Sequence, residues 1–295
     1  MRTDSQEIKL KTPFLELAAL RWGDPAGIPL LALHGWLDNA ASFLPMAQYF
    51  DDMNMVALDW PGHGHSEHRH PSASYHVTEF MWDIHAAMDA LGWDSCHLLG
   101  HSLGAAVSSI FATAAPERLR SITLIDALGP YANQASETAQ QLRRSSAGIR
   151  SKPRPRKTYA SVDDMVQARL ANSDLTEAAA RLITGRSVNQ TADGFQWSYD
   201  PGLYWTTPHY FSAEQILDCF RHIETPTLTI SAMPFASQAR EQHYQQRTQA
   251  IPNGRHELIE GGHHMHMELP EVLGKMIHDF IAEYDDPAMA LTADN

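Results

Sequence analysis

The chain carries a series of short apolar runs that are typical of strands buried on both faces of a parallel sheet. The first complete run is Ile28-Pro29-Leu30-Leu31-Ala32-Leu33, which follows a glycine- and proline-rich turn. Before it, two segments that alternate or mix apolar and polar residues predict opening strands over 7–12 and 14–22. Further buried strands are predicted at 55–58, 96–99, 122–125, 227–230 and 256–259.

Helical periodicity separates these runs. Three helices are predicted: one whose apolar face spans Val77 to Leu91, one that follows residue 102 and ends at Pro116, and one over Glu271–Tyr284. Strands that alternate with helices form βαβ units, which place helices on both faces of the sheet. The pattern therefore predicts an α/β fold with a mostly parallel central sheet flanked by helices.

The alternation of predicted strands and helices stops between about residues 128 and 215. Helical patches appear at 134–148, 162–171 and 175–184, and no buried strand is evident. We therefore predict a core in two parts, 1–127 and 216–295, interrupted by an inserted helical cap over 128–215. The tail from about residue 285 is expected to be disordered.

Composition narrows the classes of protein that this chain can belong to. Hydrophobic residues make up 43% of the 295 residues, which suffices for a large core, and the net charge of −13 argues against a nucleic-acid partner. The two cysteines, Cys96 and Cys219, lie far apart and form no disulfide or metal motif. No apolar run is long enough to span a membrane. We expect a cytoplasmic monomer or homodimer that binds a small molecule and needs no cofactor.

The pentapeptide Gly100-His101-Ser102-Leu103-Gly104 joins a predicted buried strand to a predicted helix. A serine on so tight a turn is held in a strained backbone, and its hydroxyl stands clear of the sheet above the start of the helix. Ser102 is therefore predicted to be a nucleophile. The motif by itself is weak, and the flanking strand and helix carry the inference.

A serine hydroxyl needs a base, and that base needs an acid to orient it. Three histidines in Gly261-Gly262-His263-His264-Met265-His266 compete for the role of base at the sheet edge. His263 directly follows the glycine turn and is preferred, whereas His264 and His266 are predicted to be structural or pocket-lining. Neither this cluster nor the group His63, His65, His68 and His70 is expected to bind a metal.

The acid is predicted by elimination. Asp126 ends the strand 122–125, while the loop after the strand 227–230, Ser231 to Gln238, contains no Asp or Glu. Asp126 is therefore preferred, with Glu224 a more distant alternative. Acyl transfer also needs donors for the developing oxyanion. The backbone N–H groups of Leu103 and Trp36 are predicted to serve, because Gly35 allows the turn His34-Gly35-Trp36 to bend inward.

At these motifs the chain resembles the α/β-hydrolase superfamily. The resemblance rests on His34-Gly35-Trp36, on Asp59-Trp60-Pro61-Gly62-His63-Gly64-His65-Ser66, on the serine turn, and on Gly262-His263, and its closest pattern is that of the serine hydrolase-like proteins. It implies the nucleophile–acid–histidine order Ser102, Asp126, His263. One departure is that many members carry the acid after the later strand.

The resulting hypothesis is a serine hydrolase that cleaves carboxylic esters through an acyl-enzyme. A thioesterase, lactonase or C–C bond hydrolase would use the same triad, and a non-catalytic binding protein is the alternative from a different class. Epoxide hydrolases and dehalogenases are disfavoured because the resemblance would require an aspartate at position 102. The substrate pocket is expected to involve Trp36, His101, Trp197, Trp205 and Phe211.

Overall fold

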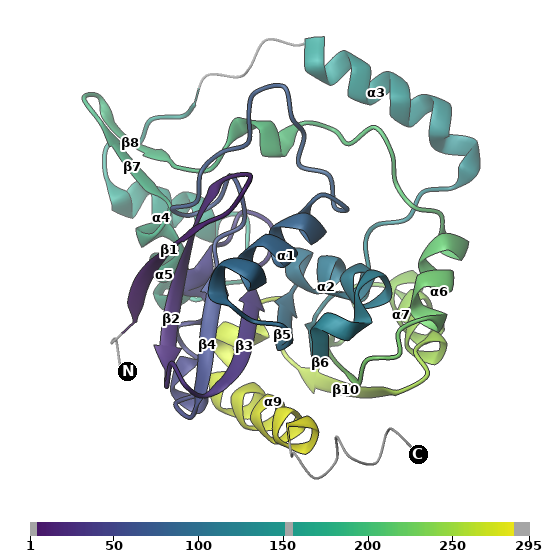
Figure 1. Cartoon of the computed structure of the whole chain (residues 1–295). Coiled ribbons are helices and arrows are strands. Elements are labelled where there is room, and N and C mark those ends of the chain that lie inside the picture. Colours follow the sequence, from purple (N-terminus) through teal and green to yellow (C-terminus); the bar gives the residue numbers. More distant parts are fainter. Residues whose placement is uncertain (1–4, 151–155, 286–295) are drawn as a thin grey trace.

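The computed structural model describes residues 5–150 and 156–285, and within them eight strands form one central sheet (Figure 1). The strand order is β1-β2-β4-β3-β5-β6-β9-β10, in which the pairings β1–β2 and β2–β4 are antiparallel and the others are parallel. The predicted fold class is confirmed. The strands are β1 (Gln6–Lys11), β2 (Glu16–Gly23), β3 (Ile28–Leu33), β4 (Met53–Leu58), β5 (Cys96–His101), β6 (Leu119–Ile125), β9 (Thr227–Met233) and β10 (Gly254–Glu260).

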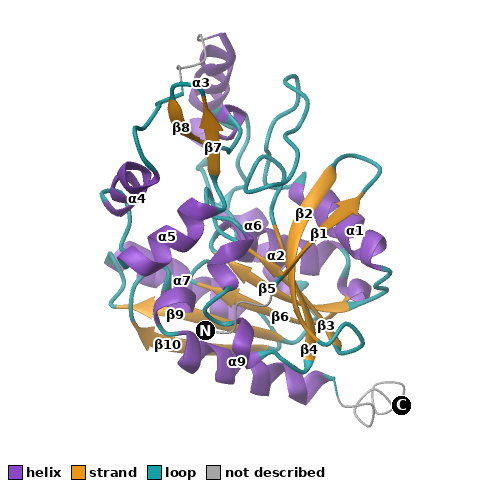
Figure 2. Ribbon diagram, turned by 90° about the vertical axis from the view of Figure 1, so that its left-hand side faces the viewer, coloured by secondary structure: helices purple, strands orange, loops and turns teal. Residues whose placement is uncertain are grey.

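Helices cover both faces of the sheet, and a separate hydrophobic cluster lies between the sheet and the helices on each face. One cluster lies beneath α1 (Phe80–Leu91), α2 (Leu103–Ala114) and α6 (Ala213–Arg221), each of which contributes a buried phenylalanine. The other lies beneath α9 (Pro270–Tyr284), which runs along the lower side of the sheet in Figure 2. The helices α7 (Gln238–Ala250) and the short α8 (Met265–Glu268) flank β10 in the sequence. This two-faced burial is the reason that the strand sequences are continuously apolar.

The segment between β6 and α6 carries α3 (Thr138–Arg150), α4 (Val162–Leu170) and α5 (Glu177–Gly185). It also contains a hairpin of β7 (Val188–Thr191) and β8 (Gly194–Trp197), which lies at the top of Figure 2 with α3. The sequence pattern did not predict this hairpin, because its residues are half-buried or exposed and form no apolar run. The helices α4 and α5 share a small hydrophobic cluster with Met267 of α8.

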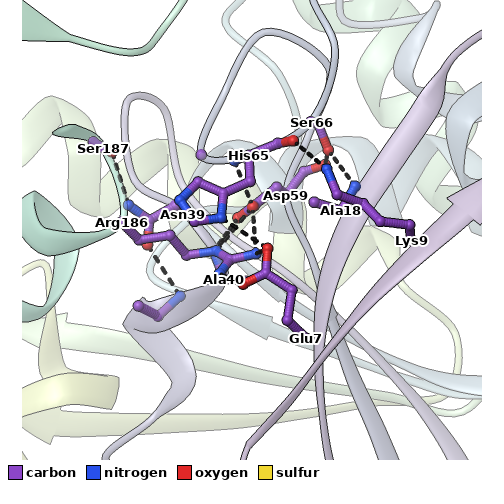
Figure 3. Close-up of polar contacts among 12 residues, drawn as sticks. Glu7, Lys9, Ala18, Asn39, Ala40, Asp59, His65, Ser66, Arg186 and Ser187 are labelled. Carbon is purple, nitrogen blue, oxygen red and sulfur yellow. Dashed lines mark hydrogen bonds and ion pairs between the residues drawn. The ribbon is translucent and has the colours of Figure 1, made fainter. Parts of the chain in front are cut away.

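Asp59, which follows β4, joins this inserted segment to the core (Figure 3). Its carboxylate is fully buried and accepts hydrogen bonds from the backbone N–H groups of Ala40, at 2.7 Å, and His65, at 2.9 Å. The Arg186 guanidinium, which follows α5, donates to the same carboxylate at 2.9 Å and to Glu7 of β1 at 3.1 Å. One buried ion pair therefore fixes the end of α5 to two loops at the carboxyl edge of the sheet.

Residues 286–295, which make up most of the tail that was expected to be disordered, lie outside the described residues. Across the ranges 5–150 and 156–285, none of the helices has the length and apolar character needed to cross a lipid bilayer.

Candidate active site

Ser102 lies on the sharp turn between β5 and α2, with φ of 52° and ψ of −111°. This positive φ is uncommon for a residue with a side chain, and it is held by glycines on both sides. A Cβ atom at Gly100 would lie 2.5 Å from the Ala105 nitrogen, and one at Gly104 would lie 2.0 Å from the Leu33 oxygen. Only glycine therefore lets α2 start this close to β5 and β3, which lifts the serine above the sheet edge.

The structure brings the three residues predicted as nucleophile, base and acid into one chain of hydrogen bonds. The Nε2 atom of His263 lies 3.0 Å from Oγ of Ser102, and its Nδ1 atom lies 2.5 Å from Oδ2 of Asp126. These residues come from the ends of β5 and β6 and from the loop between β10 and α8. The carboxylate fixes the proton on Nδ1, so Nε2 is free to accept the proton of the serine.

Asp126 is almost completely buried and has a backbone φ of 48°. Its Oδ1 atom accepts from the Ala232 N–H at 3.0 Å, and its Oδ2 atom accepts from the Arg240 guanidinium at 2.8 Å as well as from His263. Burial alone would raise the pKa of Asp126, but these hydrogen bonds and the nearby positive charge outweigh it and lower the pKa. The carboxyl group is therefore ionised, as a partner of the imidazole must be.

The other two candidates are His264, which lies with His263 in the loop 261–264 (the base loop), and His266 in α8, and neither forms a hydrogen bond to Ser102 in the described structure. His264 lies between two carboxylates, 3.0 Å from Asp174 and 3.5 Å from Asp38. His266 is completely buried, and neither of its ring nitrogens has a hydrogen-bond partner among the described residues. Burial lowers the pKa of His266 far below its ordinary value, so its ring is neutral. Only His263 reaches the serine.

His101 lies in a different position from the pocket wall that the sequence suggested. Its ring has no exposed surface, and Nε2 donates to the backbone oxygen of His263 at 2.8 Å. Burial lowers the pKa of His101 to about 3, which leaves the imidazole neutral. A neutral ring that donates from Nε2 fixes the carbonyl of the base loop, and it has no surface with which to contact a substrate.

The turn after β3 lies directly beside the serine. A Cβ atom on Gly35 would lie 3.1 Å from Cβ of Ser102, so this turn approaches the serine only because residue 35 is glycine. No described group accepts a hydrogen bond from the backbone N–H of Trp36 or of Leu103. Leu103 directly follows the serine and Trp36 directly follows the glycine that approaches it, and both amides are free to donate, as an oxyanion site requires.

The aromatic residues predicted to line a substrate pocket have varied surroundings. Trp36 is 38% exposed and lies edge-on to His63. Trp197 stacks on Tyr199 within the inserted segment, and Trp205 is 37% exposed. Phe211 packs against the hydrophobic cluster beneath α1 and α2. Contact between these side chains and a substrate stays a prediction.

The histidine-rich loop after β4 has protein partners for all four rings. His63 lies near the Pro61 carbonyl, His65 near Glu7, His68 near the Ser198 carbonyl and His70 near the Ser72 hydroxyl. Within the part of the chain that the structure describes, no group of three or more His, Cys, Asp or Glu side chains is arranged to hold a metal ion.

Four charged residues around the site escaped the sequence analysis. Arg240 contacts Asp126, Asp174 contacts the base loop, and Arg169 pairs with Asp38, which follows the turn His34-Gly35-Trp36 (the candidate oxyanion turn). Two of them, Arg169 and Asp174, belong to the inserted segment and are separated from their partners by more than 80 positions. No local sequence pattern signals such contacts, although Asp38 lies only two residues after the motif His34-Gly35-Trp36.

An α/β sheet with a serine on the turn after β5, and a histidine and an aspartate within its reach, defines the class of hydrolases that share this fold. Comparison with known proteins gives the same class. Residues 28–270 match the model of the alpha/beta hydrolase fold family, and the chain belongs to this family.

Several known relatives match nearly the full length of the chain. It is 26% identical to a serine hydrolase-like protein of Danio rerio, covering 95% of this chain and 90% of the relative. It is 28% identical to serine hydrolase-like protein 2 of Homo sapiens, with 93% of each covered. The crystal structure of the hypothetical protein PA1622 from Pseudomonas aeruginosa PAO1 superposes with a TM-score of 0.89 at 32% identity, covering 94% of this chain and 99% of that one. These relationships support a hydrolase.

Proposed function

We propose that this protein is a serine hydrolase that cleaves carboxylic esters through an acyl-enzyme intermediate. The single observation that carries the proposal is the unbroken path from Ser102 through His263 to Asp126, with separations of 3.0 and 2.5 Å. A serine that contacted only the flanking glycines and the first turn of a helix could have a purely structural role. Its alignment on Nε2 of a histidine oriented by an ionised carboxylate is the arrangement that nucleophilic catalysis needs.

In the proposed reaction, Oγ of Ser102 attacks the ester carbonyl carbon while Nε2 of His263 takes the hydroxyl proton. The tetrahedral oxyanion accepts hydrogen bonds from the backbone N–H groups of Trp36 and Leu103. When the intermediate collapses, His263 gives its proton to the alkoxide that leaves, and an acyl-serine remains. A water molecule then attacks the acyl carbon while His263 takes its proton. When this second intermediate collapses, the bond between the acyl carbon and Oγ breaks, His263 returns the proton to Oγ of Ser102, and the carboxylic acid departs.

Asp126 accepts from Nδ1 of His263 throughout this cycle and keeps its charge. The imidazolium that forms in each transition state is therefore stabilised by a buried carboxylate. Arg240 shares that carboxylate and moderates its basicity. The acyl and alcohol groups of the substrate are proposed to bind beneath the inserted segment, with Trp36, Trp205 and Phe211 as candidates for apolar contacts.

Two experiments test the proposal. A fluorophosphonate probe should label the wild-type protein and not Ser102→Ala, since the probe reacts only with an activated serine; equal labelling of both would refute the role of Ser102. A panel of p-nitrophenyl esters of graded length, run beside lactones and acyl-thioesters, then identifies the bond. We expect the highest kcat/KM on an ester, and a clear preference for a thioester or lactone would reassign the substrate class.

A further inference from the structure

Four ionisable side chains form a continuous chain across the two loops that hold the candidate active site. Arg169 of α4 pairs with Asp38, which follows the oxyanion turn. The other carboxylate oxygen of Asp38 lies 3.5 Å from Nε2 of His264. The Nδ1 atom of His264 lies 3.0 Å from Asp174, in the loop between α4 and α5. Positive and negative groups alternate along this series of four side chains, and both of its end members, Arg169 and Asp174, belong to the inserted segment.

Asp174 also contacts the candidate base directly through the backbone. Its Oδ2 atom accepts from the N–H of His263 at 2.7 Å, while its Oδ1 atom faces His264. The neighbouring glycine makes this contact possible, because a Cβ atom at Gly262 would lie 2.3 Å from Oδ2 of Asp174. The Gly-Gly turn that marked the base in the sequence is therefore the place where a carboxylate from the inserted segment enters the base loop.

The charge state of His264 decides whether this chain of ions is complete. Its ring is 8% exposed, and it is faced by Asp38, Asp174 and Arg169 and by the rings of His101, His263 and His266. Burial alone would lower the pKa of His264, but the hydrogen bonds and charges of the two aspartates outweigh it and raise the pKa. Burial lowers the pKa of both His101 and His266, so these neighbours stay neutral.

We propose that Asp174 and His264 are positioning residues, which use the ion chain to hold the base loop and the oxyanion turn in the geometry that hydrolysis requires. The inference rests on the proposed function. Neither residue contacts the reacting atoms. Asp174 acts through the backbone of His263, and protonated His264 acts through Asp38 on the turn that carries Trp36. A displacement of the inserted segment is thereby transmitted to both the base and the oxyanion donors.

The first test removes the carboxylate in two independent ways. Asp174→Ala deletes it, and Gly262→Ala pushes it away with a single methyl group at a position whose backbone needs no positive φ. Each variant should lower kcat/KM on a short p-nitrophenyl ester by about 10- to 100-fold, the cost of a small misplacement of a catalytic group. The loss should appear in kcat with KM nearly unchanged, and Asp174→Asn, which keeps one acceptor for the His263 N–H, should fall between these variants and the wild type.

Matched controls separate this effect from loss of charge or of a glycine. Asp163→Asn removes the same charge from α4, where Asp163 pairs with Arg181 at an exposed site. Gly261→Ala adds the same methyl group one residue earlier, where it would meet only the Leu269 and Met265 side chains at 3.3 and 3.7 Å. Both controls should retain activity within about two-fold of the wild type. Activity of Asp174→Ala and Gly262→Ala at the level of these controls would overturn the proposal.

The second test uses the pH dependence of kcat, which would not change if the contact were purely structural. The positive charge of His264 is present below its pKa and lost above it, so wild-type kcat should fall on the alkaline side as His264 deprotonates. Loss of the Asp174 charge lowers the pKa of His264, so the alkaline limb of Asp174→Asn should move to lower pH. The measurement is kcat against pH, and an alkaline limb at the same pH in both proteins would contradict the assignment.

A third measurement reads the charge of His264 in the wild-type protein, and a variant is used only to assign its signal. Nitrogen-15 NMR of histidine-labelled wild type, with the His264 signal assigned through His264→Asn, should show an imidazole that loses its proton at a higher pH than an ordinary histidine, and a ring that is already neutral below that range would overturn the proposal. Fluorophosphonate labelling distinguishes the two levels of inference. Failure of the wild type to label refutes the serine hydrolase itself, whereas normal labelling and turnover in Asp174→Ala refutes only the positioning role.

Discussion

The substitution Asp126→Asn tests the proposed acid, and the surroundings of Asp126 determine which way the new amide would turn. The carboxylate now accepts from three donors, namely the Ala232 N–H, the Arg240 guanidinium and Nδ1 of His263. An asparagine offers one oxygen and one NH2 group, so it opposes a donor with a donor in either orientation. The two orientations differ in which donor is opposed.

The Ala232 N–H belongs to the backbone and cannot move, while the Arg240 side chain is 47% exposed and can swing into solvent. The amide oxygen should therefore stay with Ala232, and the NH2 group should face His263. The imidazole can satisfy that donor only by moving its own proton from Nδ1 to Nε2, which then points at Ser102. In this tautomer the ring cannot accept the serine proton.

Loss of the correct tautomer in a serine triad lowers turnover by about 10⁴-fold, or roughly 5.4 kcal/mol at 1.36 kcal/mol per tenfold. We therefore expect Asp126→Asn to fold, to bind substrate and to lose about four orders of magnitude in kcat on p-nitrophenyl acetate. Burst kinetics and a urea unfolding curve would separate chemistry from stability. Turnover within ten-fold of the wild type, in a variant of normal stability, would refute Asp126 as the acid and the tautomer argument with it.

Three further predictions concern the stability of the core. Arg186→Met should lower the free energy of unfolding by about 3–5 kcal/mol, measured by urea unfolding, because it leaves the carboxylate of Asp59 buried without its counter-ion; a change below 1 kcal/mol would contradict this. Burial lowers the pKa values of His34, His63, His97, His101 and His266, so the unfolded state takes up more protons below the ordinary histidine range. The free energy of unfolding should therefore fall by about 1 kcal/mol per histidine for each pH unit between pH 6 and 5. His264 and Asp83, whose pKa burial raises to about 7, oppose this fall, and a flat profile would exclude the effect. His266→Phe should fold normally, since neither ring nitrogen has a partner in the described structure, and should reduce that slope by one histidine's share.

The sequence predicted the sheet well because burial on both faces leaves a strong signal. The same reasoning gave a wrong prediction for the strand at the edge of the sheet. Residues 256–259 were predicted to be a buried strand, yet β10 is the last strand of the sheet and Leu258 is 49% exposed. The helix α7 was not predicted at all, because its residues are almost entirely polar and only Thr248 is buried. A helix without an apolar face carries no periodic pattern to detect.

The candidate site was predictable where a residue lies next to a strand end or a glycine turn. Ser102, His263 and Asp126 each occupy such a place, and elimination of the loop after β9 pointed to Asp126. What that loop supplies instead is the Ala232 N–H, while Arg240 of α7 adds a positive charge. Contacts of this kind join segments more than 100 positions apart. They depend on the folded structure, so no local sequence pattern predicts them.

The inserted segment is joined to the core at loops that are themselves parts of the candidate site. Arg186 contacts Asp59 after β4, and Arg169 contacts Asp38 after β3. Both loops lie at the carboxyl edge of the sheet, where α/β folds bind their ligands. A segment that only covered a pocket would need apolar packing and no buried charges, which are costly to remove from water. Two ion pairs with buried carboxylates are retained here, so movements of α4 and α5 cannot leave the loops around Ser102 undisturbed. Residues that tune substrate preference should therefore be sought in these helices as well as in the pocket.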